Sequence, residues 1–99
     1  MNDPRLLRLA PDDNICAART AIAAGETIRI DGRDVRVSVQ IPTGHKIAVR
    51  AIAAGEKVFK YGAPIGSATQ PIAPGDYVHT HNLKSDYLPT FARGANYEA

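Results

Sequence analysis

The sequence predicts an all-β domain that is small and built from short strands and Gly-rich turns. Short runs of β-branched residues alternate with polar ones, which is the period of a half-buried strand. One seven-residue template, with a glycine followed by Glu or Asp at its centre, occurs at residues 22–28, 52–58 and 72–78. Short strands with many corners favour a folded-over clip or a partly open barrel over a flat sandwich.

The first elements are a candidate strand at residues 5–10 and turn formers at residues 11–14. Residues 15–22 are ambiguous, because their alanine content favours a helix while the segment spans only about two helical turns. The glycine corner that follows favours a strand. Thr27–Ile30 and residues 35–41 flank an Asp-Gly turn, which is a hairpin signal. The residues expected to share one face of that hairpin are Val35, Val37, Val39 and Ile41, with Arg36, Ser38 and Gln40 on the other.

The repeated template predicts three tight turns. In its third copy Pro74 presets φ for the second position of a turn and Gly75 supplies the positive φ of the third, which is the chemistry of a type II turn. By analogy the corners at Gly25 and Gly55 turn in the same way. The copies start 30 and then 20 residues apart, a spacing too irregular for a solenoid.

The middle of the chain is expected to present His45 and Lys46 in a loop, just before a strand begins. Loops are where functional side chains concentrate. Gly66 is expected to mark a bulge or a close approach of another backbone segment. The elements expected here are a loop at residues 42–46 and strands at 47–52, 58–62 and 65–69, with residues 62–64 between the last two.

Length and composition limit the classes of function. A chain of 99 residues is expected to form one domain, with residues 84–99 as a C-terminal tail that docks on this domain or on a partner. The net charge of +2, with scattered basic residues, disfavours nucleic-acid binding. The single Cys16 forms no internal disulfide, and a reducing cytoplasm fits best. The longest apolar runs are only a few residues, so no membrane-spanning segment is expected.

His79 and His81 form a His-x-His pair in the last strand-like run. In a strand, these two side chains share one face with Tyr77 and Leu83. Two imidazoles about 7 Å apart at their Cα atoms can converge on one metal ion or one anionic ligand. The alternative is structural, because two histidines alone leave a metal site short of ligands and such pairs also cap the open end of a small sheet.

Three linked motifs, in this order along the chain, carry a resemblance to a known family. They are Ile41-Pro42-x-Gly44-His45-Lys46-x-Ala48, then Gly55-Glu56-x-Val58-x-Lys60-Tyr61-Gly62-x-x-Ile65-Gly66-x-Ala68, and Gly75-x-x-Val78-His79-x-His81-Asn82. Together they resemble the N-terminal SAF-type domain of the altronate and galactarate dehydratases, over about residues 13–89. The resemblance implies a β-clip fold and a much larger catalytic part, in the same chain or as a separate subunit. The small subunit of sulfolactate sulfo-lyase is a close relative within this resemblance.

What the resemblance implies is a hydro-lyase that eliminates water from a sugar acid such as altronate or galactarate and depends on a divalent metal, Fe2+ or Mn2+. It implies a large catalytic dehydratase subunit as partner, and this subunit would supply most of the metal's coordination sphere. The implied substrate is a small acidic carbohydrate. The chain alone is expected to be inactive, and a homo-oligomer is left open. The implied site residues are His45, His79 and His81 for catalysis, His79 and His81 as metal ligands, and Lys46, Lys60, Tyr61 and Asn82 for substrate binding.

Other interpretations of the same residues stay open. Lys46 also fits a solvated surface charge, and Lys60 and Tyr61 also fit ordinary strand residues. At the level of function, the rivals are a non-catalytic carbohydrate-binding or chaperone-like SAF module, and a sulfo-lyase that acts on sulfolactate. A stand-alone metal-binding hydrolase is disfavoured, because the chain has few candidate ligands and little bulk for a cleft.

Overall fold

The computed structural model describes residues 2–8 and 10–86, which fold into strands and turns without a helix. The all-β prediction is therefore confirmed. All strand pairs are antiparallel, and in the described residues no helix is long and apolar enough to cross a membrane. One sheet has four strands, in the order β1 (Leu6–Leu7), β2 (Ile15–Ala18), β5 (Lys46–Ala48), β8 (Tyr77–Val78). A second is the hairpin of β3 (Thr27–Ile30) and β4 (Arg33–Arg36). The third has three strands, in the order β6 (Lys57–Lys60), β7 (Ala63–Ala68), β9 (Leu83–Lys84).

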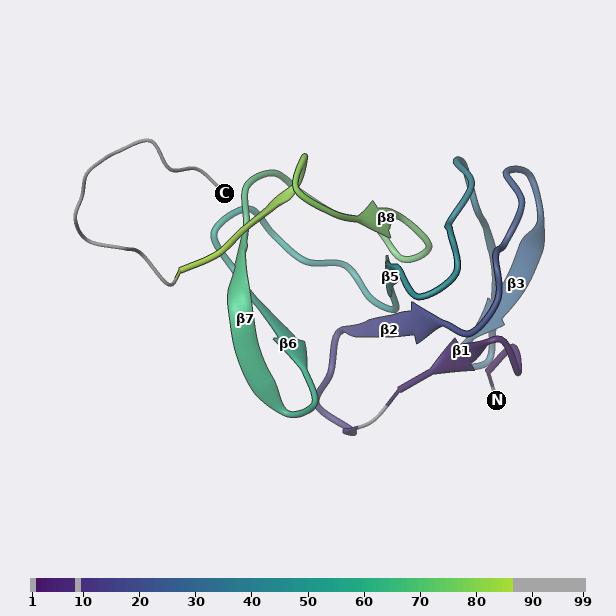
Figure 1. The fold of residues 1–99 in the computed structure, drawn as a ribbon, viewed down its shortest axis with the longest axis horizontal. Coiled ribbons are helices and arrows are strands. Elements are labelled where there is room, and N and C mark those ends of the chain that lie inside the picture. The colour runs from purple at the N-terminus through teal and green to yellow at the C-terminus, as the bar shows by residue number, and fades with distance from the viewer. Residues whose placement is uncertain (1, 9, 87–99) are drawn as a thin grey trace.

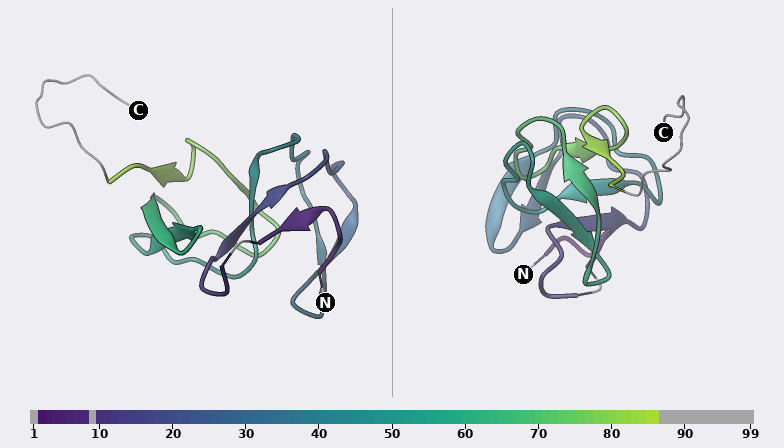
Figure 2. Two further views of the ribbon diagram at one scale, coloured as in Figure 1. Left: turned by 60° about the horizontal axis from the view of Figure 1, so that its bottom comes forward. Right: turned by 90° about the vertical axis from the view of Figure 1, so that its left-hand side faces the viewer.

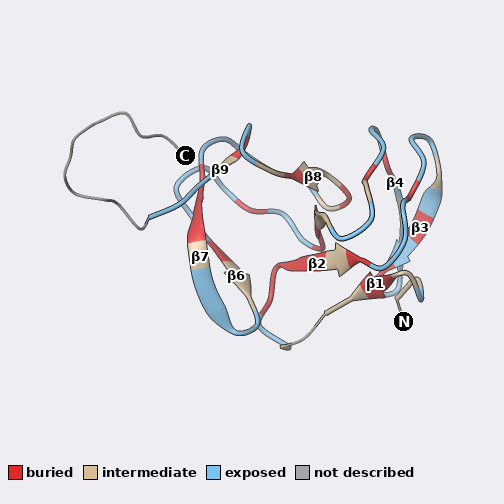
Figure 3. Ribbon diagram, in the orientation of Figure 1, coloured by how far each residue is buried: buried red, intermediate tan, exposed pale blue. Residues whose placement is uncertain are grey.

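The two hairpins lie at opposite ends of the molecule. The β3–β4 hairpin and the β6–β7 hairpin flank the four-stranded sheet, whose strands come from both halves of the chain (Figures 1 and 2). Burial is concentrated where these parts meet, while the tip of the β6–β7 hairpin is exposed (Figure 3). The central sheet is therefore the place where residues distant in sequence come together.

Among the described residues, four corners, not three, share one turn geometry. At residues 23–26, 42–45, 53–56 and 73–76 the amide of the fourth residue donates to the carbonyl of the first, over 2.9 to 3.2 Å. The third residue of each corner is a glycine with φ between 82° and 90°, as a type II turn requires. The turns predicted at Gly25, Gly55 and Gly75 are confirmed. The loop predicted at residues 42–46 contains the fourth, and β5 begins at Lys46 rather than at Ile47.

Three of the corners are locked by an acidic side chain in the fourth position. The carboxylates of Glu26, Glu56 and Asp76 each accept the backbone N–H of the first residue of their own turn, at 2.6 to 2.9 Å. The corner at residues 42–45 begins with Pro42, which has no N–H to donate. His45 occupies the acidic position there, and its side chain is left without a partner in its own turn.

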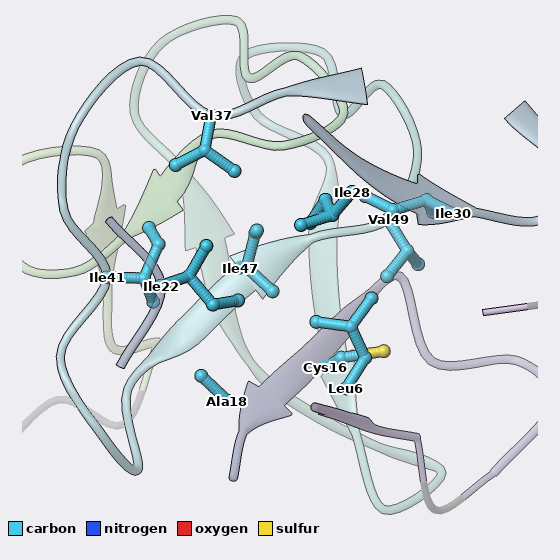
Figure 4. Packing of buried hydrophobic residues seen from close by; sticks show 10 residues of the cluster. All are labelled: Leu6, Cys16, Ala18, Ile22, Ile28, Ile30, Val37, Ile41, Ile47 and Val49. Carbon is cyan, nitrogen blue, oxygen red and sulfur yellow. The ribbon is translucent and has the colours of Figure 1, made fainter. Parts of the chain in front are cut away.

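The apolar core consists of two clusters, one for each pair of corners. Ile22 and Ile41 exchange backbone hydrogen bonds over the first cluster, and Ile52 and Ile72 do so over the second. The buried thiol of Cys16 lies within the first cluster (Figure 4). The buried members of the first cluster are Leu6, Cys16, Ala18, Ile22, Ile28, Ile30, Val37, Ile41, Ile47 and Val49, and those of the second are Ile15, Ala48, Ile52, Val58, Ala68, Ile72 and Val78.

Several predicted elements differ from the structure in detail. Residues 15–22 are a strand only as far as Ala18, and β4 ends at Arg36, so the alternation expected up to Ile41 stops early. Val39, expected to share a face with Val37 and Ile41, is 47% exposed for this reason, whereas those two residues are buried. The turn between β6 and β7 is Tyr61–Gly62, not residues 62–64, and both residues have positive φ. At Gly66 the backbone of β9 approaches closely, because a Cβ there would meet the carbonyl oxygen of Lys84.

Asp13 and Asn14 join the central sheet to the β6–β7 hairpin. The buried Asp13 carboxylate accepts the backbone N–H groups of Tyr61 at 2.9 Å and Gly62 at 2.8 Å. The Asn14 side chain accepts the N–H of Phe59 and donates to the carbonyl of Lys57. The positive φ of Tyr61 is thereby held by hydrogen bonds to a buried carboxylate rather than by its own preference.

We expect Asp13→Ala to destabilise the domain by about 1 to 3 kcal/mol, because it removes the buried carboxylate that accepts the two N–H groups of the hairpin turn. Asp12→Ala is the matched control. Asp12 is exposed and its backbone carbonyl, not its side chain, accepts from Arg50, so its loss should cost less than about 0.5 kcal/mol. Urea unfolding of both variants measures the difference, and equal stabilities would show that the hairpin turn does not depend on this carboxylate.

Candidate functional site

The pairing of β5 with β8 brings together the two ends of the predicted site. The register places Lys46 opposite Val78 and Ile47 opposite Tyr77, and the two strands lie side by side at the centre of Figure 1. His45 immediately precedes β5, and His79 immediately follows β8. Residues more than 30 positions apart in sequence therefore become neighbours.

The prediction that His79 and His81 lie on one strand is wrong. β8 ends at Val78, and residues 79–82 form a turn in which the carbonyl of His79 accepts the N–H groups of Asn82 at 3.1 Å and Leu83 at 2.9 Å. The buried Asn82 side chain accepts the N–H of His79 and donates to the carbonyl of Tyr77, both at 2.9 Å. The amide of Asn82 thus satisfies backbone groups in its own turn, and these contacts hold the two histidines in place.

All three histidines nevertheless gather, and they do so around Tyr77. Nδ1 of His45 lies 2.6 Å from the Tyr77 hydroxyl oxygen. The ring of His79 stacks on the Tyr77 ring, with centroids 5.5 Å apart and planes 5° apart, and also lies 5.3 Å from the ring of His45. The ring of His81 is tilted against Tyr77 at 5.8 Å. We call these four side chains the Tyr77 cluster.

Tyr77 was not among the residues predicted for the site. Its place next to the His-x-His pair was visible in the sequence, but its link to His45 depends on the β5–β8 pairing. The ring nitrogens of His79 and His81 have no hydrogen-bond partner in the described part of the chain, so both are open to a ligand or to proton transfer.

A groove of about 570 Å³ adjoins the cluster. Lys46 and His79 line it, and no ion pair within the described residues involves Lys46. Partial burial lowers the pKa of Lys46, and the nearby charge of Lys60 lowers it further. A half-buried cation without an anionic partner is suited to hold a carboxylate. The other lining residues are Ile65, Thr80, Leu83, Lys84 and Ser85.

The remaining predicted residues do not line this groove. Tyr61 is 60% exposed at the β6–β7 turn, and the Lys60 ammonium lies over its ring at 4.9 Å from the centroid. Neither residue lines the groove. Asn82, Tyr77 and His81 contribute to a second hollow of about 210 Å³. Of the two stacked rings, that of His79 therefore belongs to a residue lining the groove and that of Tyr77 to a residue lining the second hollow.

A metal centre is not complete in the part of the chain that the structure describes. Within residues 2–8 and 10–86, no group of three or more His, Cys, Asp and Glu side chains is arranged to hold an ion. His45 directs Nδ1 at Tyr77, which leaves the imidazoles of His79 and His81, one stacked on the Tyr77 ring and the other tilted against it. A metal bound here would need further ligands from another part of an assembled enzyme, and the two-histidine ligand set stays a prediction.

Comparison with known proteins agrees with the motifs. Residues 4–86 match the sequence model of the altronate/galactarate dehydratase SAF domain. This chain belongs to that family. We call it the SAF domain from here. The three motifs predicted this family correctly, but the match begins at residue 4 rather than at about residue 13.

Two kinds of curated relative are similar to this SAF domain. It is 36% identical over 80 residues to altronate dehydratase of Bacillus subtilis and 39% identical over 74 residues to that of Escherichia coli. These alignments cover 81% and 75% of this chain but only 16% and 15% of those enzymes. It is also 42% identical over 57 residues to (2R)-sulfolactate sulfo-lyase subunit alpha of Paracoccus pantotrophus, covering 56% of this chain and 85% of that subunit.

Proposed function

We propose that this SAF domain is the small subunit, or the N-terminal domain, of a hydro-lyase that removes water from a sugar acid such as altronate or galactarate. A large catalytic subunit or domain would complete the site. The observation that carries the proposal is the Tyr77 cluster, three histidines on one tyrosine beside a groove lined by Lys46, with which no described residue forms a salt bridge. Membership of the dehydratase SAF family supports the reaction class.

The residues of the cluster suit the chemistry of elimination. Removal of water from a hydroxy acid needs a base at the carbon next to the carboxylate and an acid that protonates the departing hydroxyl. Imidazoles serve both roles near neutral pH, and His79 and His81 have ring nitrogens free for them. Lys46 would hold the substrate carboxylate as a point charge. A divalent metal, Fe2+ or Mn2+, stays part of the proposal as a cation held mainly by the large partner.

A second substrate class is favoured by a specific observation. The alignment with the Paracoccus sulfo-lyase covers 85% of its subunit alpha, a far larger share than of either altronate dehydratase. A sulfolactate molecule carries two anionic groups, which the lysine-lined groove would also accept. The name of that relative, a subunit, supports a larger partner here.

A cytoplasmic location also stays a proposal, supported by the free thiol of Cys16.

The isolated chain is expected to be folded but inactive, because the described residues present too few converging groups for elimination. The assay compares the chain alone with the chain co-purified with its large partner, each with Fe2+ or Mn2+, on altronate, galactarate and (2R)-sulfolactate. Turnover by the complex alone supports the proposal, and the preferred substrate separates the two classes. Robust turnover by the chain alone would refute the need for a partner, and an inactive complex would favour a non-catalytic SAF module.

A further inference from the structure

Tyr77 is the side chain common to the three imidazoles of the site. Its hydroxyl contacts Nδ1 of His45, its face stacks on His79, and the ring of His81 is tilted against it. Tyr77 belongs to β8, and its ring is half-buried. A rigid residue at this point can set the orientation of its neighbours without itself touching a substrate.

The Tyr77–His45 hydrogen bond can form in either direction, and the tautomer of His45 decides which. A tyrosine hydroxyl carries one proton, and the only acceptor that the described residues offer it is Nδ1 of His45, 2.6 Å away. A neutral imidazole has one acceptor nitrogen and one N–H. If the hydroxyl donates to Nδ1, the proton of the neutral ring must sit on Nε2.

The corner explains why His45 is available for this contact. Its counterparts Glu26, Glu56 and Asp76 each bond back to the first amide of their own turn. Pro42 removes that amide in the fourth corner, so no local partner competes for the side chain at position 45. The turn geometry is kept by Gly44 and the backbone bond between His45 and Pro42, at 3.0 Å.

We propose that Tyr77 is a positioning residue that holds neutral His45 in the Nε2–H form, so that Nε2 donates a hydrogen bond and Nδ1 is not a base. The tautomer is a property of this chain alone. Its use in elimination rests on the proposed function, in which Nε2–H would donate to a substrate oxygen while His79 and His81 remain free to accept protons.

The tautomer is tested on the full chain labelled with 15N, without added metal and at a pH where the ring is neutral. Long-range 1H–15N correlation distinguishes an unprotonated ring nitrogen from one that carries a proton. We expect Nδ1 of His45 to be unprotonated and hydrogen-bonded, and we expect its 15N shift to change in Tyr77→Phe. Tyr61→Phe is the matched control for the spectrum, because the Tyr61 hydroxyl has no partner in the described residues. A protonated Nδ1, or a His45 spectrum unchanged in Tyr77→Phe, would overturn the proposal.

The role in the reaction is tested separately, in the complex with the large partner. Tyr77→Phe keeps the ring that stacks on His79 and removes only the hydroxyl, so the chain should fold. We expect kcat to fall about tenfold to a hundredfold, the scale seen when a residue that orients a functional group is lost, with KM little changed. An unchanged kcat would remove Tyr77 from the reaction. An inactive wild-type complex would reject the proposed function and leave the tautomer result standing.

Discussion

In the assembled enzyme, His79→Ala is expected to lower turnover by about a hundredfold or more while the isolated chain stays folded. That is the scale for loss of a general acid or base. The structural contacts of His79 come from its backbone, which bonds to Asn82 and Leu83 and which alanine retains. What the substitution removes is the imidazole that lines the groove and stacks on Tyr77. His81→Ala, which also leaves its turn intact, should act in the same way.

Two measurements on each variant separate a site role from a structural one. If the imidazoles serve the reaction, turnover of the complex should fall while the melting temperature of the isolated chain stays unchanged. Arg33→Ala is a suitable control, because Arg33 is exposed at the start of β4 and lines neither hollow. A lower melting temperature with unchanged turnover would remove both histidines from the site and leave His45 and Lys46 as its strongest candidates.

Gly75→Val is expected to produce the largest loss of stability, about 3 kcal/mol or more. Gly75 has φ of +90°, where a β-branched residue costs roughly 1 to 3 kcal/mol. A Cβ at this position would also meet the side chain of Val35 and lie 3.4 Å from the carbonyl oxygen of Arg36. For a domain of this size the melting temperature should fall on the order of 15 °C.

Gly55→Val separates the two causes of that loss. Gly55 has nearly the same φ, +87°, but a Cβ there would meet nothing within 4 Å, so only the backbone strain should remain. Lys84→Ala, an exposed change outside the corners, should cost less than about 0.5 kcal/mol. Equal losses for the two glycine variants would mean that the Val35 contact relaxes without cost. A Gly75→Val variant as stable as the parent would contradict the turn itself.

Much of the local structure could be predicted from residue patterns. The Asp31–Gly32 hairpin turn was predicted from its sequence, and the structure has positive φ at both residues. The corner template was recognised by its glycine and acid, and it missed the copy at residues 42–45 because His45 replaces the acid. The Tyr61–Gly62 turn was placed too late, because tyrosine rarely adopts a positive φ and the Asp13 carboxylate that supports it lies 48 residues away in sequence.

The sequence by itself determined the all-β class and the glycine corners, since these depend on residues that are close in the chain, and the family, through motifs spread over residues 41–82. Only the tertiary structure decided that the three histidines share one tyrosine. His45 and Tyr77 are 32 positions apart, and their contact exists because the register of β5 against β8 places Ile47 opposite Tyr77. Local patterns set the turns through φ preferences, whereas proximity between distant residues is set by which strands pair and in what register.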